Sequence, residues 1–184
     1  MRIFIATNFP SEVLRDVNAR VTAVRPRLPS ASWVREETQH LTFAFLGDQP
    51  QTLIDRITPL LSEALATTPK FEARLHDCGF FPNPRHARVG WVGLQPDQQF
   101  IGIARTVRDI VTRNGVKLDG GEFKPHLTIM RVRDPWPPSS IDLFNRTLRD
   151  YTSEPFIVDA VTLYSSELNP KGAIHTPLRK FPLA

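Results

Sequence analysis

The sequence predicts an α+β fold built from two similar halves, and three observations support this. Four segments carry apolar residues at helical spacing, and shorter segments rich in β-branched and aromatic residues lie between them. Some of these strand segments follow one another without a helix, which favours antiparallel pairing over a purely parallel sheet. A histidine-containing motif occurs twice, 86 positions apart, close to half the chain length.

The first part of the chain is expected to alternate strands and helices. Residues 2–7 (RIFIAT) are apolar enough for a buried strand. Residues 11–24 follow as a helix, because apolar side chains recur there every three or four positions and prolines bound the segment on both sides. Residues 33–34 form a short extended piece, residues 40–47 a second strand and residues 52–66 a second helix.

The second part continues with paired strands. Residues 71–80 and 87–94 are expected to be two strands joined across the turn Pro82-Asn83-Pro84. The remaining expected elements are a helix at 97–113, a strand at 123–132, a helix at 140–151, and strands at 156–165 and 173–181. The 17 prolines are dispersed at element ends, and no linker divides the chain. Residues 1–184 are therefore expected to form one domain.

Composition excludes several classes of protein. Of the 184 residues, 41% are hydrophobic and 23% are charged, which is typical of a folded globular chain and not of a disordered or fibrous one. No run of about 18 apolar residues occurs, so no membrane-spanning segment is predicted. The formal net charge of +4, from 23 Lys+Arg against 19 Asp+Glu, favours anionic ligands only modestly.

Cys78 is the only cysteine, so the chain can form neither an intramolecular disulfide nor a cysteine-based zinc site. The opening MRIFIATNFP has too short an apolar stretch for a signal peptide. Together these features predict a soluble protein of the reducing cytoplasm. The histidines share no metal-ligand spacing and no glycine-rich nucleotide loop occurs, so neither a metal nor a cofactor is predicted.

The repeated motif is His-Leu-Thr followed by an apolar residue. It occurs as His40-Leu41-Thr42-Phe43 and as His126-Leu127-Thr128-Ile129, and both copies lie in expected strands. Because side chains alternate along a strand, the histidine and threonine of each copy share one face and the apolar residues take the other. If a pseudo-twofold axis relates the halves, the two His-x-Thr faces meet across a cleft.

Two histidines facing one cleft can act as an acid–base pair, because imidazole titrates near pH 6.5 and supplies both protonation states. Two threonine hydroxyls can donate hydrogen bonds to the non-bridging oxygens of a phosphate. This set suits cleavage of a phosphodiester without a metal: one histidine takes a proton from water, and the other protonates the leaving oxygen. A lone His-Leu-Thr is more often structural, but two copies at this spacing favour a catalytic pair.

With these motifs in place, the sequence resembles the two-histidine phosphoesterase superfamily, which is marked by two His-x-Thr motifs in a duplicated fold. The similarity is greatest to its RNA 2',3'-cyclic phosphodiesterase branch, also called 2'-5' RNA ligases, and covers nearly the whole chain. The stretches that carry it are RIFIATNFP, WVREETQHLTFAFLG, GFFPNPRHARVGWVGL, FKPHLTIMRV and NPKGAIHTPLRKFPL.

The resemblance implies a bilobal fold of two antiparallel sheets, with helices on the outside and a central cleft. It implies hydrolysis of an RNA 2',3'-cyclic phosphate to a 2'-phosphate, with His40 donating a proton to the leaving 3'-oxygen and His126 acting as the base for water. Thr42 and Thr128 are implied to bind the phosphate. The expected partner is an RNA or oligonucleotide end, with tRNA fragments as candidates, and the expected state is a monomer.

The chain departs from the family's pattern at three places. Ala44 stands where a basic residue is common, and its parity with Thr42 places it on the cleft face. His175 stands where a tyrosine is frequent. Residues 165–168 (SSEL) are a weakened form of a Glu-Ser-Arg-Leu stretch.

Two charged residues beside the second motif are candidate substrate-binding residues. Lys124 has the parity of His126, whereas Arg131 has the opposite parity and reaches the cleft only if the strand bends or ends there. For each, a solvated surface charge is an equally good interpretation.

Other charged and aromatic residues are less specific. Three arginines could lie near a phosphate path: Arg35, Arg85 and Arg88. Three histidines are expected to be surface residues or to have hydrogen-bond partners: His76, His86 and His175. Three tryptophans could stack on bases, although the first two are expected in the core: Trp33, Trp91 and Trp136.

Two other functions are considered. Formation of a 2'-5' bond between RNA halves reverses the cleavage chemistry, so the same residues would serve both directions. A non-catalytic RNA- or nucleotide-binding module is the other alternative. The presence of both histidines argues against it, because binding alone needs hydrogen-bond donors but no proton-transfer pair.

Overall fold

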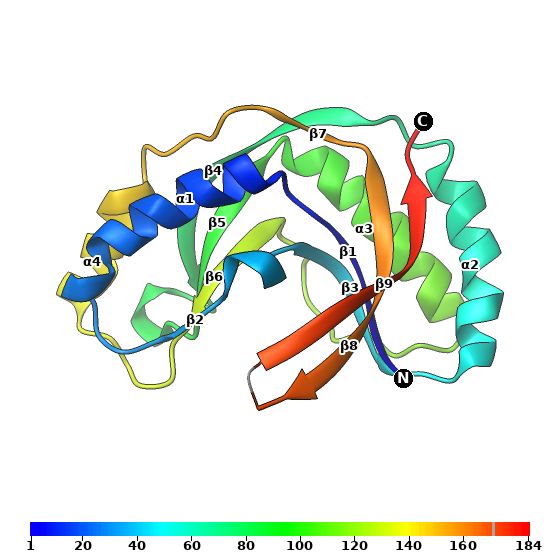
Figure 1. Cartoon of the computed structure of the whole chain (residues 1–184), viewed down its shortest axis with the longest axis horizontal. Helices are drawn as coiled ribbons and strands as arrows, with labels where there is room; N and C mark the ends of the chain where they lie inside the picture. Colours follow the sequence, from blue (N-terminus) through cyan, green and yellow to red (C-terminus); the bar gives the residue numbers. More distant parts are fainter. Residues whose placement is uncertain (171) are drawn as a thin grey trace.

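Two antiparallel sheets form the centre of the fold, and the computed structural model describes residues 1–170 and 172–184 (Figure 1). The first sheet has the order β3-β1-β8-β9, with β1 at Arg2–Thr7, β3 at Leu41–Asp48, β8 at Ala160–Asn169 and β9 at Gly172–Pro182. The second sheet has the order β2-β6-β5-β4-β7, with β2 at Ser32–Trp33, β4 at Phe71–Phe81, β5 at Val89–Gln95, β6 at His126–Arg131 and β7 at Phe156–Val158. The expected α+β class is confirmed.

The four helices lie in two pairs on the outside of the sheets (Figure 1). Helices α1 (Ser11–Val24) and α4 (Pro138–Leu148) pack against each other beside the second sheet. Helices α2 (Gln51–Leu65) and α3 (Asp97–Arg113) do the same beside the first sheet. Short 3-10 turns lie at Arg25–Arg27, Glu36–Thr38 and Pro84–His86. No helix in the described part of the chain is both long enough and apolar enough to cross a bilayer.

The sequence repeat extends from the motifs to the helices. Moving α1 by 86 positions gives residues 97–110, which lie within α3, and moving α2 gives residues 137–151, which cover α4. The halves also exchange elements, because α1 packs with α4 and α2 packs with α3. Strand β4 pairs in the second sheet and β8 in the first. Each lobe is therefore built from both halves of the chain.

The apolar faces expected from helical spacing are the buried ones. In α3, for example, Phe100, Ile103, Val107 and Val111 are all buried. Each side chain of this size contributes roughly 1.5–3 kcal/mol when it is fully removed from water. The helices are therefore held by packing onto the sheets more than by their own helix propensity.

Most element bounds lie within two residues of the expected ones, and three differ more. The second motif strand begins at His126, not at residue 123, and α4 spans 138–148 in place of 140–151. The expected strand at 156–165 is two strands in different sheets: β7 pairs with β4, whereas β8 pairs with β1. The chain changes sheets at Asp159 without a turn, so the sequence carries no local signal for the break.

Strand β3 contains a bulge in the first motif. Thr42 and Ala44 pair with consecutive residues of β1, so Phe43 is an extra residue in the strand. A bulge of this kind reverses the alternation of side chains beyond it. The expectation that Ala44 faces the cleft is therefore wrong: Ala44 is 2% exposed and lies in the core, whereas Phe45 is 46% exposed.

Strand β6 contains the equivalent bulge in the second motif. Thr128 and Met130 pair with consecutive residues of β5, which leaves Ile129 as the extra residue. Met130 is buried and Arg131 is exposed, as Ala44 and Phe45 are in the first motif. The bulge therefore reverses the alternation of side chains before Arg131. This reversal allows Arg131 to share a face with Thr128.

Candidate active site

A cavity of about 610 Å³, the central cavity, is lined by residues from both sheets, among them the histidine and the threonine of each motif. His40 and Thr42 enter it at the start of β3, His126 and Thr128 enter it from β6, and Arg131 lies at the end of β6. The structure thus brings together five of the six predicted site residues. The other lining residues are Arg2, Phe4, Val34, Thr38, Gln39, Phe45, Ser166, Leu168, Ala173 and His175.

The two motif histidines are held by the same hydrogen bond. Nδ1 of His40 donates to the carbonyl of Thr38 at 2.8 Å, and Nδ1 of His126 donates to the carbonyl of Lys124 at 2.7 Å. In each case the acceptor lies two residues before the histidine. Because a carbonyl only accepts, Nδ1 carries the hydrogen and Nε2 is the ring nitrogen that titrates.

A phenylalanine packs against each of these rings. Phe4 stacks on His40 with ring centres 4.7 Å apart, and Phe81 meets His126 edge-on at 4.9 Å. With one nitrogen hydrogen-bonded and one side of the ring packed, each imidazole has little freedom to rotate. This preorganisation favours proton transfer at a fixed position.

Burial lowers the pKa of both motif histidines. It is the main cause that lowers the pKa of His40 to about 4; His175 lowers it further, and the bond to Thr38 opposes the shift. Burial also lowers the pKa of His126; the bond to the Lys124 carbonyl opposes this, while the charges of Arg131 and Lys124 add to it. Without a bound anion, both rings are therefore mainly neutral at pH 7.

His175 lies in the cleft, contrary to the expectation that it is a surface residue or has a hydrogen-bond partner. Its ring meets His40 edge-on, with centres 5.2 Å apart, and it lines the central cavity. Its Nδ1 is buried and has no hydrogen-bond partner among the described residues. It reaches this place from β9, where it pairs with Ser166 of β8 in a hairpin that extends past the other strands of its sheet (Figure 1).

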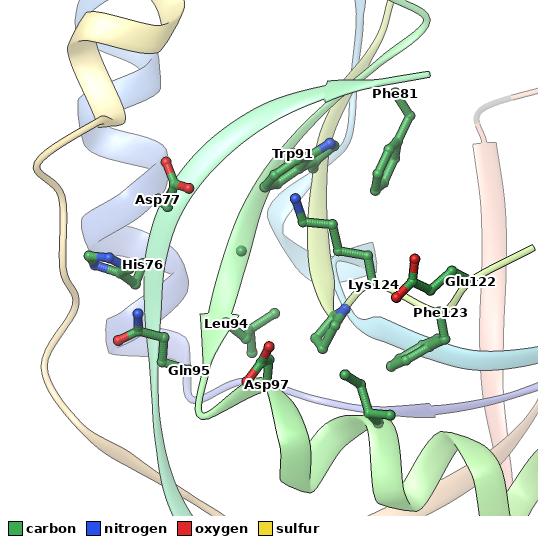
Figure 2. A pocket seen from close by; sticks show the side chains of 13 residues that line it. His76, Asp77, Phe81, Trp91, Leu94, Gln95, Asp97, Glu122, Phe123 and Lys124 are labelled. Carbon is green, nitrogen blue, oxygen red and sulfur yellow. The ribbon is translucent and has the colours of Figure 1, made fainter. Parts of the chain in front are cut away.

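Lys124 does not line the central cavity. Its Nζ lies 4.1 Å from the centre of the Trp91 ring, in a neighbouring cavity that both residues line (Figure 2). Residue 124 precedes β6, so strand alternation does not govern the direction of its side chain. Its contribution to the motif is its backbone carbonyl, which orients His126.

Sequence reasoning also missed Arg2 and Phe45 as cleft residues. Arg2 lines the cavity and lies 4.8 Å from the ring centre of Phe45, which lines it as well. Arg2 lies at the opening of the first strand, far from both motifs in sequence, and Phe45 is hidden by the bulge. Only the register of β1 against β3 brings the two together.

The remaining charged candidates lie outside the cavity. Arg35 pairs with Glu37 at 3.2 Å, Arg88 donates to the Arg133 carbonyl, and Arg85 lines a small pocket elsewhere. None of these three arginines lines the central cavity.

Two of the three other histidines meet the expectation. His76 is hydrogen-bonded to Thr152 at 3.0 Å, and His86 is exposed. Trp91 is buried, as expected, and Trp33 packs partly buried against the core. Among the described residues, no three His, Cys, Asp or Glu side chains lie close enough together to hold a metal ion.

Comparison with known proteins agrees with this geometry. Residues 11–170 match the family model of the 2'-5' RNA ligase superfamily. The chain belongs to this superfamily. A superfamily relative from Thermotoga maritima, an RNA 2',3'-cyclic phosphodiesterase, is 29% identical over 181 residues, covering 97% of this chain and 93% of the relative. A second protein of that name, from Archaeoglobus fulgidus, is 32% identical over 187 residues, covering 98% and 99%.

Solved structures of this type share the fold. TT0787 of Thermus thermophilus has a TM-score of 0.80 at 30% identity, covering 100% of this chain and 98% of that one. Escherichia coli LigT complexed with 3'-AMP has a TM-score of 0.78 at 25% identity, covering 99% and 97%. The resemblance drawn from the two motifs and the expected fold class are both confirmed.

Proposed function

We propose that this protein hydrolyses RNA 2',3'-cyclic phosphate ends to 2'-phosphates, with His40 and His126 as the acid and the base and with no metal ion. The observation that carries the proposal is the pair of equivalently held imidazoles lining one cavity, each followed by a threonine two residues later. The relatives of similar length support the substrate class, because they are RNA 2',3'-cyclic phosphodiesterases.

The reaction requires two proton transfers at one phosphorus. Water attacks phosphorus opposite the 3'-oxygen, so a new P–O bond forms as the bond to the 3'-oxygen breaks. Nε2 of His126 accepts a proton from the water, and Nε2–H of His40 donates a proton to the 3'-oxygen, which leaves as a hydroxyl. The phosphate stays on the 2'-oxygen. Histidines from different sheets suit transfers on opposite sides of phosphorus.

His40 must acquire a proton before it can act as the acid. Its pKa of about 4 leaves it neutral at pH 7 in the unliganded protein. The cyclic phosphate is an anion, and an opposite charge within about 4–6 Å favours the charged form of a titrating group. Substrate binding therefore raises the pKa of His40, so that His40 is protonated in the enzyme–substrate complex and can act as the acid.

The other cleft residues neutralise and orient the phosphate. Thr42 and Thr128 donate hydrogen bonds from their hydroxyls to its non-bridging oxygens. Arg131 and Arg2 add positive charge, and an arginine can hold a phosphate through two parallel hydrogen bonds. Lys124, which lies over Trp91 in the neighbouring cavity, binds the RNA outside the central cavity.

The partner and setting follow from the same chemistry. The substrates are RNA or oligonucleotide ends, tRNA fragments among them, and residues 1–184 act as one domain and as a monomer, because one chain supplies both motifs. The reaction takes place in the reducing cytoplasm, where the free Cys78 thiol is stable. Burial raises the pKa of that thiol to about 12, which keeps it unreactive.

Product analysis tests the proposal. The purified protein should open a 2',3'-cyclic nucleotide to the 2'-phosphate in excess EDTA. His40→Asn and His126→Asn should each lower kcat by about 10²–10⁴-fold, the range of general acid–base catalysis. His86→Asn is the matched control, because His86 is exposed and outside the cleft. Dependence on an added divalent metal, a 3'-phosphate product, or a normal rate in either cleft variant would refute the mechanism.

A further inference from the structure

A second cavity, of about 540 Å³, lies outside the central cavity (Figure 2), and its wall includes Phe81, the ring that packs against His126. Its wall includes the rings of Phe81, Trp91 and Phe123. Carboxylates of Asp77, Asp97 and Glu122 also line it. The cavity therefore combines aromatic surface with hydrogen-bond acceptors, and of these side chains only Phe81, which packs against His126, takes part in arranging the reaction at phosphorus.

This Trp91 cavity is connected with the reaction site. A hollow of about 360 Å³ shares Thr42 and His126 with the central cavity, and Phe81 and Lys124 with the Trp91 cavity. A ligand whose phosphate lies between the two motif histidines can therefore place an attached group beside Trp91. That group can belong to the nucleotide that carries the cyclic phosphate or to its neighbour in the RNA.

Trp91 carries an unused hydrogen-bond donor. The side chain is 5% exposed, and its buried Nε1–H has no acceptor among the described residues. In Figure 2 the nitrogen edge of the ring is directed toward Phe81, another residue of the cavity wall. Buried tryptophan N–H groups usually have partners, so this one indicates an acceptor that arrives with a ligand.

A glycine allows the Trp91 ring to lie close to the neighbouring strand. A Cβ at Gly79 would approach Cζ2 of Trp91 to 2.5 Å, so a side chain there would collide with the ring. Gly93, which lines the Trp91 cavity, lacks a Cβ that would approach the His76 carbonyl oxygen to 2.8 Å. The group over the ring is the ammonium of Lys124, an exposed and flexible side chain that forms no salt bridge with a described residue.

We propose that the Trp91 cavity is a nucleobase subsite, in which a base packs on Trp91 in place of the Lys124 ammonium and accepts a hydrogen bond from Nε1. The carboxylates disfavour a phosphate there but can accept hydrogen bonds from the amino groups of adenine, cytosine or guanine. The displaced Lys124 is then free to pair with a backbone phosphate. This inference rests on the proposed function, because it uses the phosphate position between His40 and His126.

Kinetics with and without a base test the subsite. The substrates are ribose 2',3'-cyclic phosphate, adenosine 2',3'-cyclic phosphate, and a dinucleotide ending in adenosine 2',3'-cyclic phosphate. Trp91→Phe keeps a ring but removes Nε1–H, and Asp97→Asn removes one carboxylate. Each should lower kcat/KM on a base-carrying substrate about tenfold more than on the ribose compound, in line with the effect of a lost base contact.

The two nucleotide substrates identify which base occupies the subsite. A loss already present with the cyclic mononucleotide assigns the subsite to the nucleotide that carries the cyclic phosphate. A loss confined to the dinucleotide assigns it to the neighbouring nucleotide. Equal changes on all three substrates, or none, would overturn the proposal.

Controls separate this inference from the proposed function. Trp136→Phe is the matched variant, because Trp136 is also buried but donates to the Ser30 carbonyl outside the cleft. If the wild-type protein opens no cyclic phosphate, the proposed function fails. Calorimetric titration with 3'-AMP and with a dinucleotide ending in adenosine 3'-phosphate then tests the subsite alone. Trp91→Phe should bind at least one of the two about tenfold more weakly than Trp136→Phe does, and equal affinities for both would overturn the inference.

Discussion

The edge-on contact between His175 and His40 makes the two motif histidines unequal. His175 lowers the pKa of His40, whereas the positive charges of Arg131 and Lys124 act on His126. The pKa of His40 therefore depends on another titrating ring, whereas the pKa of His126 depends on neighbours that are charged at neutral pH. An acid and a base with separate roles need such a difference.

Removing His175 should raise the pKa of His40. In His175→Gln the pKa of His40 is expected to rise from about 4 but to stay below 6.5, because burial is the larger cause of the shift and persists. Histidine side-chain NMR across pH 3–8 measures this directly. His86→Gln is the control and should leave the His40 titration in place. An unchanged pKa in His175→Gln would show that the two rings are not coupled.

Binding of a cyclic phosphate should take up a proton at His40. In the His126→Asn background turnover is slowed about 10²–10⁴-fold, and a 2',3'-cyclic nucleotide stays a monoanion over the useful pH range. Its affinity should rise as pH falls from 7 toward 5, by up to tenfold per pH unit for one proton. Calorimetric titration in two buffers of different ionisation enthalpy counts the proton. The double variant with His40→Asn should lose this pH dependence.

At the residue scale, the sequence predicts what is local. His40, Thr42, His126 and Thr128 could be predicted because each pair lies within three residues and occurs twice. His175 could not, because its place beside His40 depends on the pairing of β9 with β8 and of β8 with β1. No spacing in the sequence encodes that register.

At the element scale, the two bulges decide which side chains face the cleft. Without Phe43 as an extra residue, Ala44 would share the face of Thr42 and Phe45 would be buried. The extra residue, Phe43 or Ile129, lies next to another apolar residue that is also buried. A pair of adjacent apolar residues in a strand is compatible with either register, so the sequence pattern favoured plain alternation.

Placing the same polar residue on either side of the bulge should give opposite results. Ala44→Gln puts an amide into a core position and is expected to lower the free energy of unfolding by about 2 kcal/mol or more. Phe45→Gln changes a half-exposed side chain and should cost about 1 kcal/mol or less. Urea denaturation of both variants measures the difference. The reverse order would show that β3 alternates without a bulge.

At the scale of the whole molecule, buried neutral histidines make stability depend on pH. The folded pKa of His40, about 4, lies below the value of 6.5 in an unfolded chain, so the unfolded state binds the proton more readily between these values. The free energy of unfolding should therefore fall as pH drops from 6.5 to 4, with His40 contributing on the order of 3 kcal/mol. His126 and His175 act in the same direction.

Urea denaturation of wild type and His40→Asn at pH 4.5–7.5 checks this dependence. The slope of stability against pH should be smaller in the variant, whatever its stability at pH 7.5. Carboxylates contribute equally to both proteins, so the difference between the curves reports His40. Parallel curves would mean that His40 titrates normally in the folded state.

The arrangement of the lobes is less predictable than the elements within them. Periodicity locates α1 and α3 at their observed bounds, because each helix face is a local pattern. No local sequence pattern predicts that α1 packs with α4. Nor does one predict that β4, from the first half of the chain, joins the sheet of β6, or that β8, from the second half, joins the sheet of β3. Those choices depend on contacts between residues far apart in sequence.

The exchange of helices and strands has an evolutionary consequence. A half-length ancestor with this topology would have left its sheet without a third strand and its helices without their partners, so it would have folded only as a pair of identical chains. In such a pair the two motifs would be identical, and only the bound substrate could distinguish one histidine from the other. In the single chain the two motifs differ in sequence, for example in Phe45 and Arg131, which lie 86 positions apart, so the protein itself can make the surroundings of the two histidines unequal.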